Sequence, residues 1–200
     1  MPELFFDVET TGLPPRGADP AKYQHYDSCR VISIAWVLRD QNTVYAQRYA
    51  VTNPGTPGDE EVEIGAESIH GISRSVVDNY GKDTSLILRD FVADVKKAEI
   101  IVAHNLEFDK SVVCAELFRM GCSEDARHVL NTTSLCTMKS TTNLVRIKNS
   151  YGSFKWPKLE ELHSFLFGHT FENAHHAMCD VDALVACYYR LRDRFVVTKK

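Results

Sequence analysis

Several kinds of sequence feature are scarce or absent in this chain, and each absence excludes a class of protein. The six cysteines are scattered, with no Cys-x-x-Cys pair and no Cys/His cluster, which excludes a zinc ribbon and predicts reduced thiols. No apolar run is long enough to cross a membrane, and the first residues lack the basic end and apolar stretch of a signal peptide. We therefore expect a soluble, cytoplasmic protein with no membrane contact.

An excess of basic residues is missing as well. The chain has 23 Lys and Arg against 27 Asp and Glu, a net charge of −4, so its total charge does not indicate nucleic-acid binding. The distribution is uneven, however, because residues 126–159 contain no Asp or Glu but six Lys or Arg. Such a segment is either an ordinary solvated loop region or, beside an acidic metal site, a surface that attracts a phosphodiester backbone.

The stretch from Leu4 to Leu13 carries the main functional signal. Its apolar and aromatic residues predict a buried strand, yet Asp7 and Glu9 stand two positions apart and therefore on one face of it. Unpaired buried carboxylates are costly unless a cation neutralises them or the strand opens onto water. Hard oxygen ligands of this kind suit Mg²⁺ or Mn²⁺. The alternative is an exposed edge strand with both acids in solvent, against which the apolar neighbours argue.

The rest of the chain predicts an α/β fold with a mixed sheet, in one domain over residues 1–200. Further strands are expected where β-branched or apolar residues cluster, the first two pairing with the initial strand as an antiparallel meander: residues 30–38, 43–51, 99–103 and 133–138. A turn is expected at residues 53–58. Helices are expected where apolar residues recur with helical spacing or a start signal is present: residues 83–97, 107–120, 157–168 and 176–194, with a single turn at 65–70.

Two further acids are expected to point toward the first strand. Asp109 heads an otherwise apolar stripe on its helix, formed with Val113, Leu117 and Met120, so its carboxylate is directed inward. Asp180 belongs to the last helix. Acids from three separate segments would then meet at one place on the sheet.

Three motifs in the chain resemble those of a known nuclease superfamily. They are Asp7-Val8-Glu9 followed by Thr-Thr-Gly-Leu, the run from Asn105 to Asp109, and the run from His175 to Asp180. In order and spacing they resemble the three exonuclease motifs of the DEDDh, or DnaQ-like, superfamily, which includes the proofreading epsilon subunit of bacterial DNA polymerase III, RNase T and oligoribonuclease. The resemblance implies a ribonuclease H-like fold, a mixed β-sheet flanked by α-helices.

The resemblance also implies roles for single residues. Position by position, the metal-binding acids are Asp7, Glu9, Asp109 and Asp180, which would hold two divalent ions, Mg²⁺ or Mn²⁺, and His175 is the general base. Contacts with the terminal nucleotide are implied for the residues that follow the first motif, and further substrate contacts are expected near the other motifs; the full set is Thr10, Thr11, Gly12, Leu13, Asn105, Phe108 and Trp156.

Helical geometry alone favours the neighbouring histidine as the base. His176 and Asp180 are four residues apart and would share a helix face, whereas His175, five residues away, would lie about 140° round the axis. If the helix begins at His176 or Ala177, however, His175 lies in the preceding loop and can reach the water. The resemblance to the family motif favours His175 as the general base.

The four acids and the histidine are suited to metal-assisted cleavage of a phosphodiester, and the resemblance implies a 3′-to-5′ exonuclease that releases nucleoside 5′-monophosphates from single-stranded or frayed DNA ends. Its polarity is implied by the resemblance alone. The alternatives are an exoribonuclease or oligoribonuclease that trims RNA, a catalytically inert nucleic-acid-binding module, and a structural Ca²⁺ site, which would give His175 no role. A polymerase or another replication protein is a candidate partner.

Aromatic and basic residues alternate in the acid-free segment. Tyr151, Phe154 and Trp156, together with Lys148, Lys155 and Lys158, can offer stacking faces and phosphate contacts to a frayed 3′ strand. For Trp156, packing in the core is the favoured expectation, because large aromatic side chains are usually buried. The stacking interpretation predicts that single-stranded ends are preferred over blunt duplex.

Overall fold

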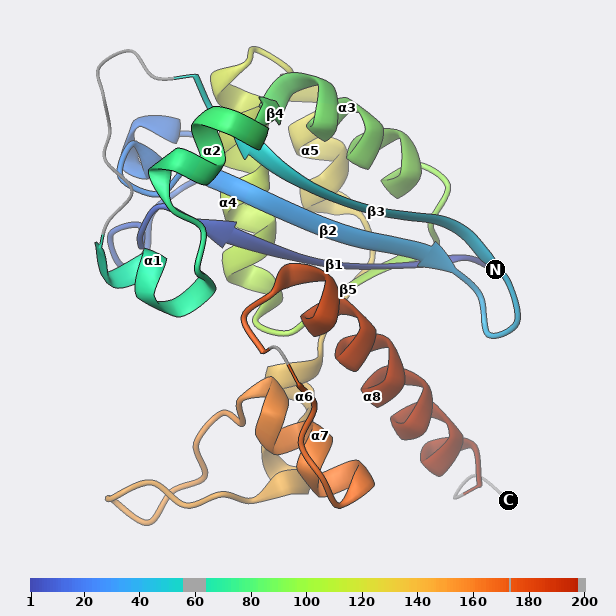
Figure 1. Cartoon of the computed structure of the whole chain (residues 1–200). Coiled ribbons are helices and arrows are strands. Elements are labelled where there is room, and N and C mark those ends of the chain that lie inside the picture. Colours follow the sequence, from blue (N-terminus) through green and yellow to red (C-terminus); the bar gives the residue numbers. More distant parts are fainter. Residues whose placement is uncertain (56–63, 173, 198–200) are drawn as a thin grey trace.

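Long apolar and β-branched runs form the central strands of a six-stranded mixed sheet (Figure 1). The computed structural model describes residues 1–55, 64–172 and 174–197. The strand order is β4-β3-β2-β1-β5-β6, and the strands are β1 (Glu3–Thr10), β2 (Val31–Arg39), β3 (Val44–Asn53), β4 (Lys82–Asp83), β5 (Ile100–Ala103) and β6 (Ser134–Cys136). The antiparallel meander of the first three strands is confirmed, and β5 and β6 extend the sheet in parallel beside β1.

Helices cover both faces of the sheet. Helices α3, α4 and α5 lie on one face and α8 lies on the other, while α6 and α7 form a lobe against the second half of α8 (Figure 1). The helices are η1 (Tyr23–Tyr26), α1 (Ile64–His70), α2 (Arg74–Tyr80), α3 (Thr84–Val95), α4 (Leu106–Arg119), α5 (Ser123–Asn131), α6 (Thr137–Val145), α7 (Leu159–Phe167) and α8 (Ala177–Val197). Among the described residues, no helix is both long enough and apolar enough to cross a membrane.

Alternation along β1 divides its side chains between two cores. Leu4, Phe6 and Val8 pack in the cluster under α3, α4 and α5, whereas Phe5 packs against α8. Burial of each large side chain stabilises the fold by about 1.5–3 kcal/mol. Because β1 pairs with β2 along its length and Asp7 and Glu9 are half-buried, the interpretation of this stretch as an exposed edge strand with both acids in solvent is wrong.

The first strand and the last helix are also joined by polar contacts. At the start of β1, the buried Glu3 carboxylate accepts hydrogen bonds from the hydroxyls of Tyr188 and Tyr189 and from Arg192, at 3.1 Å for Tyr188 and 3.2 Å for Arg192. Phe5 meets the Tyr188 ring edge-on, with ring centroids 5.0 Å apart. These contacts fix α8 across the sheet.

Several predicted boundaries need correction. The strand expected at 133–138 is confined to Ser134–Cys136, because Thr137 begins α6. The helix expected from Pro157 begins at Leu159, where the Lys158 N–H donates to Glu161 at 2.7 Å and caps the first turn. The last helix begins at Ala177 and extends to Val197. Of the turn expected at 53–58, only residues 53–55 are among those described.

Candidate active site

Asp7 and Glu9 lie in the part of β1 that pairs with β2 but not with β5. β5 pairs with β1 only from Glu3 to Phe5, so the later residues of β1 face an open edge on that side. The Val8 N–H, which a longer β5 would have bonded, donates instead to the Asp109 carboxylate at 3.2 Å. The half-buried carboxylates of Asp7 and Glu9 point to the face that α8 covers, the same face as Phe5.

Asp109 reaches this position because α4 begins directly after β5. Asn105 adopts left-handed backbone geometry (φ 77°), a conformation that Asn tolerates better than most residues, and turns the chain from strand to helix. Asp109 then lies in the first helical turn, 3% exposed. The inward direction expected for its carboxylate is confirmed.

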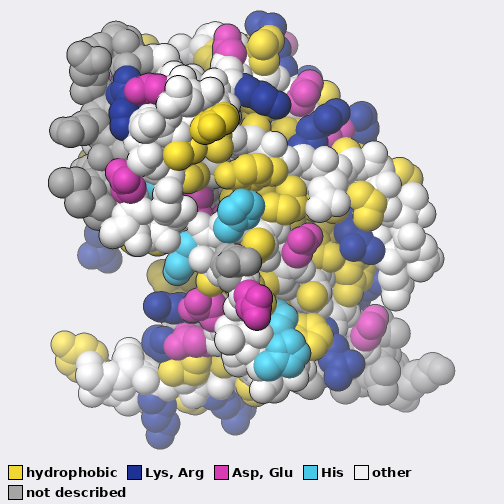
Figure 2. All heavy atoms as spheres, viewed as in Figure 1, with side chains coloured by type: hydrophobic (Ala, Val, Ile, Leu, Met, Phe, Trp, Pro, Cys, Tyr) yellow, Lys and Arg dark blue, Asp and Glu magenta, His cyan; other side chains and the backbone are white. Residues whose placement is uncertain are grey.

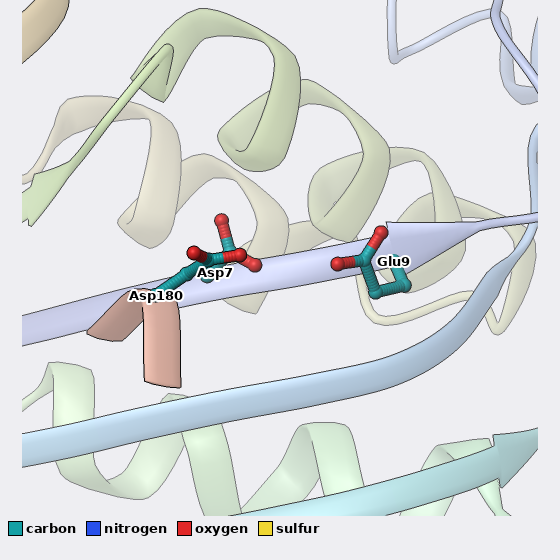
Figure 3. Close-up of side chains that lie close together, drawn as sticks. All are labelled: Asp7, Glu9 and Asp180. Carbon is teal, nitrogen blue, oxygen red and sulfur yellow. The ribbon is translucent and has the colours of Figure 1, made fainter. Parts of the chain in front are cut away.

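Three carboxylates come together at this edge (Figure 3). Oxygen atoms of Asp7, Glu9 and Asp180 lie within 4.8 Å of one another, with Asp7 and Glu9 on β1 and Asp180 on the first turn of α8. Asp109 is not part of this cluster and lies beside it, held by Val8. Within the described part of the chain, no Lys, Arg or His forms an ion pair with any of the four acids.

Burial and mutual repulsion make these acids hard to ionise. Burial, followed by the negative charges of Asp109, Glu9 and Asp180, raises the pKa of Asp7 well above its usual range. Burial and the neighbouring carboxylates raise the pKa of Glu9 to about 8. Burial raises the pKa of Asp109 to about 8, although the hydrogen bond from Val8 opposes the shift. Burial also raises the pKa of Asp180 to about 6. The cluster therefore lacks a positive charge, and its oxygen-only donor set fits Mg²⁺ or Mn²⁺.

The two neighbouring histidines are placed differently. Because α8 begins at Ala177, His175 lies in the preceding loop, with left-handed backbone geometry (φ 70°), and its N–H donates to Asp180 at 3.0 Å. The His176 ring instead packs near Tyr49, with ring centroids 4.9 Å apart. The argument that His176 shares a helix face with Asp180 therefore fails, since His176 precedes the helix.

A cavity of about 490 Å³ opens in front of the carboxylates, and we call it the acidic cavity. All four acids and His175 line it. Three predicted contact residues, Asn105, Phe108 and Trp156, line it as well. Trp156 is 59% exposed, so the expectation that it packs in the core is wrong.

A second cavity of about 400 Å³, the side cavity, adjoins the acidic cavity at Val8, Glu9 and Phe108. The predicted residues Thr10, Gly12 and Leu13 line it. Thr11 lines neither cavity: its hydroxyl donates to the Ser28 carbonyl at 3.0 Å and accepts from the Arg30 N–H at 2.9 Å.

Sequence reasoning missed two contributions to the cavity walls. Ala66, Ile69 and His70 of α1 line the side cavity, although no local motif marked that helix as functional. His104 lines the acidic cavity, and its ring nitrogens lie 3.0 Å from the Thr137 hydroxyl and 2.9 Å from the Pro157 carbonyl. Burial lowers the pKa of His104, so a neutral ring joins the end of β5 to the first residue of α6 and to Pro157, shortly before α7. In the sequence, the one indication of a role for His104 was its position directly before Asn105, where the second motif begins.

Comparisons with known proteins agree with this geometry. A family model described as exonuclease matches residues 4–188. No curated protein sequence matches the chain. Among solved structures, the fold is similar to E. coli exonuclease I with a dA16 oligonucleotide (TM-score 0.75, 21% identity) and to its zinc-bound complex with single-stranded DNA (TM-score 0.73, 21% identity). Each match covers 96% of this chain but only 41% and 40%, respectively, of the other chain.

Proposed function

The chain belongs to the exonuclease family, and from this membership we propose that it is a metal-dependent 3′-to-5′ exonuclease acting on single-stranded DNA. The resemblance to the DnaQ-like superfamily and the expected ribonuclease H-like fold are confirmed. The observation that carries the proposal is the cluster of Asp7, Glu9 and Asp180 at the wall of the acidic cavity, beside His175. The products would be nucleoside 5′-monophosphates.

The carboxylates are proposed to hold two divalent cations. Asp7, Glu9 and Asp180 supply the clustered oxygens, and Asp109 supplies a fourth carboxylate on the adjoining wall. Bound there, such ions provide an activated water and offset the charge that builds on the leaving oxygen. The raised pKa values of the acids are consistent with a site that is completed by positive charge.

His175 is proposed to take the proton from the attacking water. Its exposed ring stands in a loop at the cavity wall, while its backbone N–H is fixed to Asp180. A neutral imidazole can accept a proton at a ring nitrogen, which is the role of a general base. Because the backbone, and not the ring, makes this hydrogen bond, the imidazole is free to adjust as the substrate arrives.

The side cavity is proposed to hold the terminal nucleotide. Leu13 and Ile69 are 76% and 59% exposed, and with Phe108 they offer apolar surface next to Glu9. A base can stack or pack there while its phosphate faces the acids. Single-stranded DNA is the proposed substrate because the similar E. coli exonuclease I structures hold single-stranded DNA and a dA16 oligonucleotide.

The test uses a 20-residue oligo(dT) and its RNA counterpart, each labelled at the 5′ end, with Mg²⁺, with Mn²⁺ and with EDTA. We expect a ladder that shortens from the 3′ end, monophosphate products, no reaction in EDTA and faster cleavage of DNA. Asp7→Asn is the inactive control. A ladder that persists in EDTA would contradict the metal assignment, and faster cleavage of RNA would make the protein an exoribonuclease.

A further inference from the structure

A hairpin projects from the lobe between α6 and α7 (Figure 1). We call residues 146–156 the basic hairpin. Lys148 and Phe154 pair as an antiparallel bridge, the Lys155 N–H donates to the Ile147 carbonyl at 2.8 Å, and the Asn149 N–H donates to the Ser153 carbonyl at 2.8 Å. At the tip, the Asn149 side chain accepts from the backbone N–H groups of Tyr151 and Ser153 at 2.9 and 3.1 Å. These bonds give the hairpin a defined shape.

The pairing separates its side chains into two sets. Because Lys148 lies opposite Phe154, their side chains share one face, to which Trp156, two positions farther from the tip, also belongs. Arg146 ends α6 with left-handed backbone geometry (φ 58°) and lies next to this face at the base of the hairpin. All four side chains are exposed, Phe154 by 40% and Trp156 by 59%. The alternate residues anchor the hairpin: Ile147 lies in a shallow groove beside α7, and Lys155 forms a 2.6 Å ion pair with Glu161.

The exposed face combines uncompensated positive charge with aromatic rings. Among the described residues, neither Arg146 nor Lys148 forms an ion pair. The surrounding sequence, residues 126–159, has no Asp or Glu that would offset their charge. Tyr151, at the tip, is 92% exposed. Exposure of three large aromatic side chains on one short hairpin is costly in water unless a ligand covers them.

The hairpin is continuous with the acidic cavity. Trp156 belongs to both: it ends the hairpin and lines the cavity wall, where the Lys139 ammonium lies 5.7 Å from its ring centroid. Figure 2 shows the molecule hollowed between its upper part and the lower lobe, with Lys and Arg side chains, and Asp and Glu side chains beside them, along the lower margin. A strand leaving the acidic cavity past Trp156 would meet Phe154 and Lys148 next.

We propose that this exposed face binds the single-stranded segment on the 5′ side of the terminal nucleotides. Arg146 and Lys148 contact its phosphates, and Phe154 and Tyr151 stack with its bases. Alternation of cations with aromatic rings matches a strand whose phosphates and bases alternate, which favours nucleic acid over a protein partner. The inference rests on the proposed exonuclease function and extends it from the cleavage site to the strand that is held during cleavage.

Binding is measured first, by fluorescence anisotropy of labelled oligo(dT) of 20 residues in EDTA, with every variant in an Asp7→Asn background. Phe154→Ala is expected to weaken binding about tenfold without changing the salt dependence. Arg146→Gln and Lys148→Gln should each reduce the slope of log Kd against log salt by about 0.7, because each removes one phosphate contact with a single strand. A structural role alone would not change that slope.

The matched controls lie away from the hairpin. Tyr80→Ala removes a 73% exposed aromatic residue at the end of α2, and Lys82→Gln removes an exposed cation on β4. Both should bind oligo(dT) with the parent affinity and slope. Circular dichroism spectra that match the parent protein confirm that each variant is folded.

Cleavage separates this inference from the proposed function. In the otherwise wild-type protein, Phe154→Ala should lower kcat/KM for the 20-residue strand about tenfold relative to kcat/KM for a dinucleotide, which is too short to span both sites. If the wild type degrades neither substrate, the proposed function fails. If the wild type degrades both, and the hairpin variants keep its affinity, salt slope and length preference, the hairpin proposal is overturned and a protein partner becomes the better occupant.

Discussion

The backbone N–H of His175 donates a 3.0 Å hydrogen bond to the Asp180 carboxylate, which joins the proposed base to a proposed metal ligand. Because the donor is the backbone, the bond does not depend on the imidazole. It also accounts for the left-handed geometry of His175, since that conformation turns the N–H toward the first turn of α8.

Replacing His175 therefore tests the imidazole alone. His175→Ala retains the backbone donor to Asp180, so we expect turnover at pH 8 with Mg²⁺ to fall by about 10²–10⁴-fold without loss of metal binding. His176→Ala, which removes the ring packed near Tyr49, is the matched control and should lose far less. A greater loss for His176→Ala would reverse the assignment.

Removing a carboxylate should abolish activity but stabilise the metal-free protein. The pKa of Asp7 is raised in the folded state, so its contribution to stability is present at low pH and is lost as pH rises from about 4 through the raised value. In EDTA, Asp7→Asn should increase the free energy of unfolding by about 1–2 kcal/mol at pH 8 and by much less at pH 5. Urea denaturation at the two pH values measures this, and a variant less stable than wild type at pH 8 would contradict it.

Metal affinity should rise with pH. Burial and repulsion place the pKa of Glu9 and Asp109 at about 8 and that of Asp180 at about 6, and a carboxylate must lose its proton to bind a cation. Between pH 6 and 8, the apparent Kd for Mg²⁺ should fall by about tenfold per pH unit for each proton that metal binding releases. Calorimetric titration at pH 6, 7 and 8 follows this, and an affinity independent of pH would argue against a site built from these acids.

Single-stranded 3′ ends should be cleaved at least about tenfold faster than blunt duplex ends. In the proposed arrangement the terminal nucleotide enters the side cavity, and separating it from a paired strand costs stacking and pairing energy. Rates on a labelled 20-residue strand, alone and in a blunt duplex, are compared at one salt concentration. Equal rates would contradict the preference.

His104 should matter for stability as well as for cavity shape. Its partly buried ring joins Thr137 to Pro157, and two hydrogen bonds of this kind together typically contribute about 1–3 kcal/mol. We expect His104→Ala to lower the free energy of unfolding by that amount, while His128→Ala, an exposed histidine on α5, should have almost no effect. Equal stabilities for the two variants would show that the link is unimportant.

Local pattern was sufficient for much of this molecule. Period-two and apolar runs located β1, β2 and β3, and helical periodicity located α3, α4 and α8, because burial against a neighbouring layer imposes those repeats. The motifs brought Asp7, Glu9 and Asp180 to one site, and the inward stripe of α4 correctly directed Asp109.

The remaining features depend on contacts between distant residues. His104 bonds to partners 33 and 53 residues away, and nothing in the neighbouring sequence specifies them. Ile69 contributes to the wall of the side cavity from a helix far from β1 in sequence. Trp156 was expected to be buried from its residue type, but its position between hairpin and cavity leaves it exposed. Polar helices α5 and α6 lacked a pattern clear enough to predict them.

The bonds from Tyr188, Tyr189 and Arg192 to Glu3 have a consequence for folding kinetics. Their partners are 185 to 189 residues apart, and Asp180 is delivered to β1 by the same helix. Closing a loop of this length is slow compared with forming helices or the β1–β2–β3 meander. During refolding from urea, nuclease activity should therefore return with the slowest folding phase, after most of the secondary structure has formed, so that partly folded chains cannot cut nucleic acid.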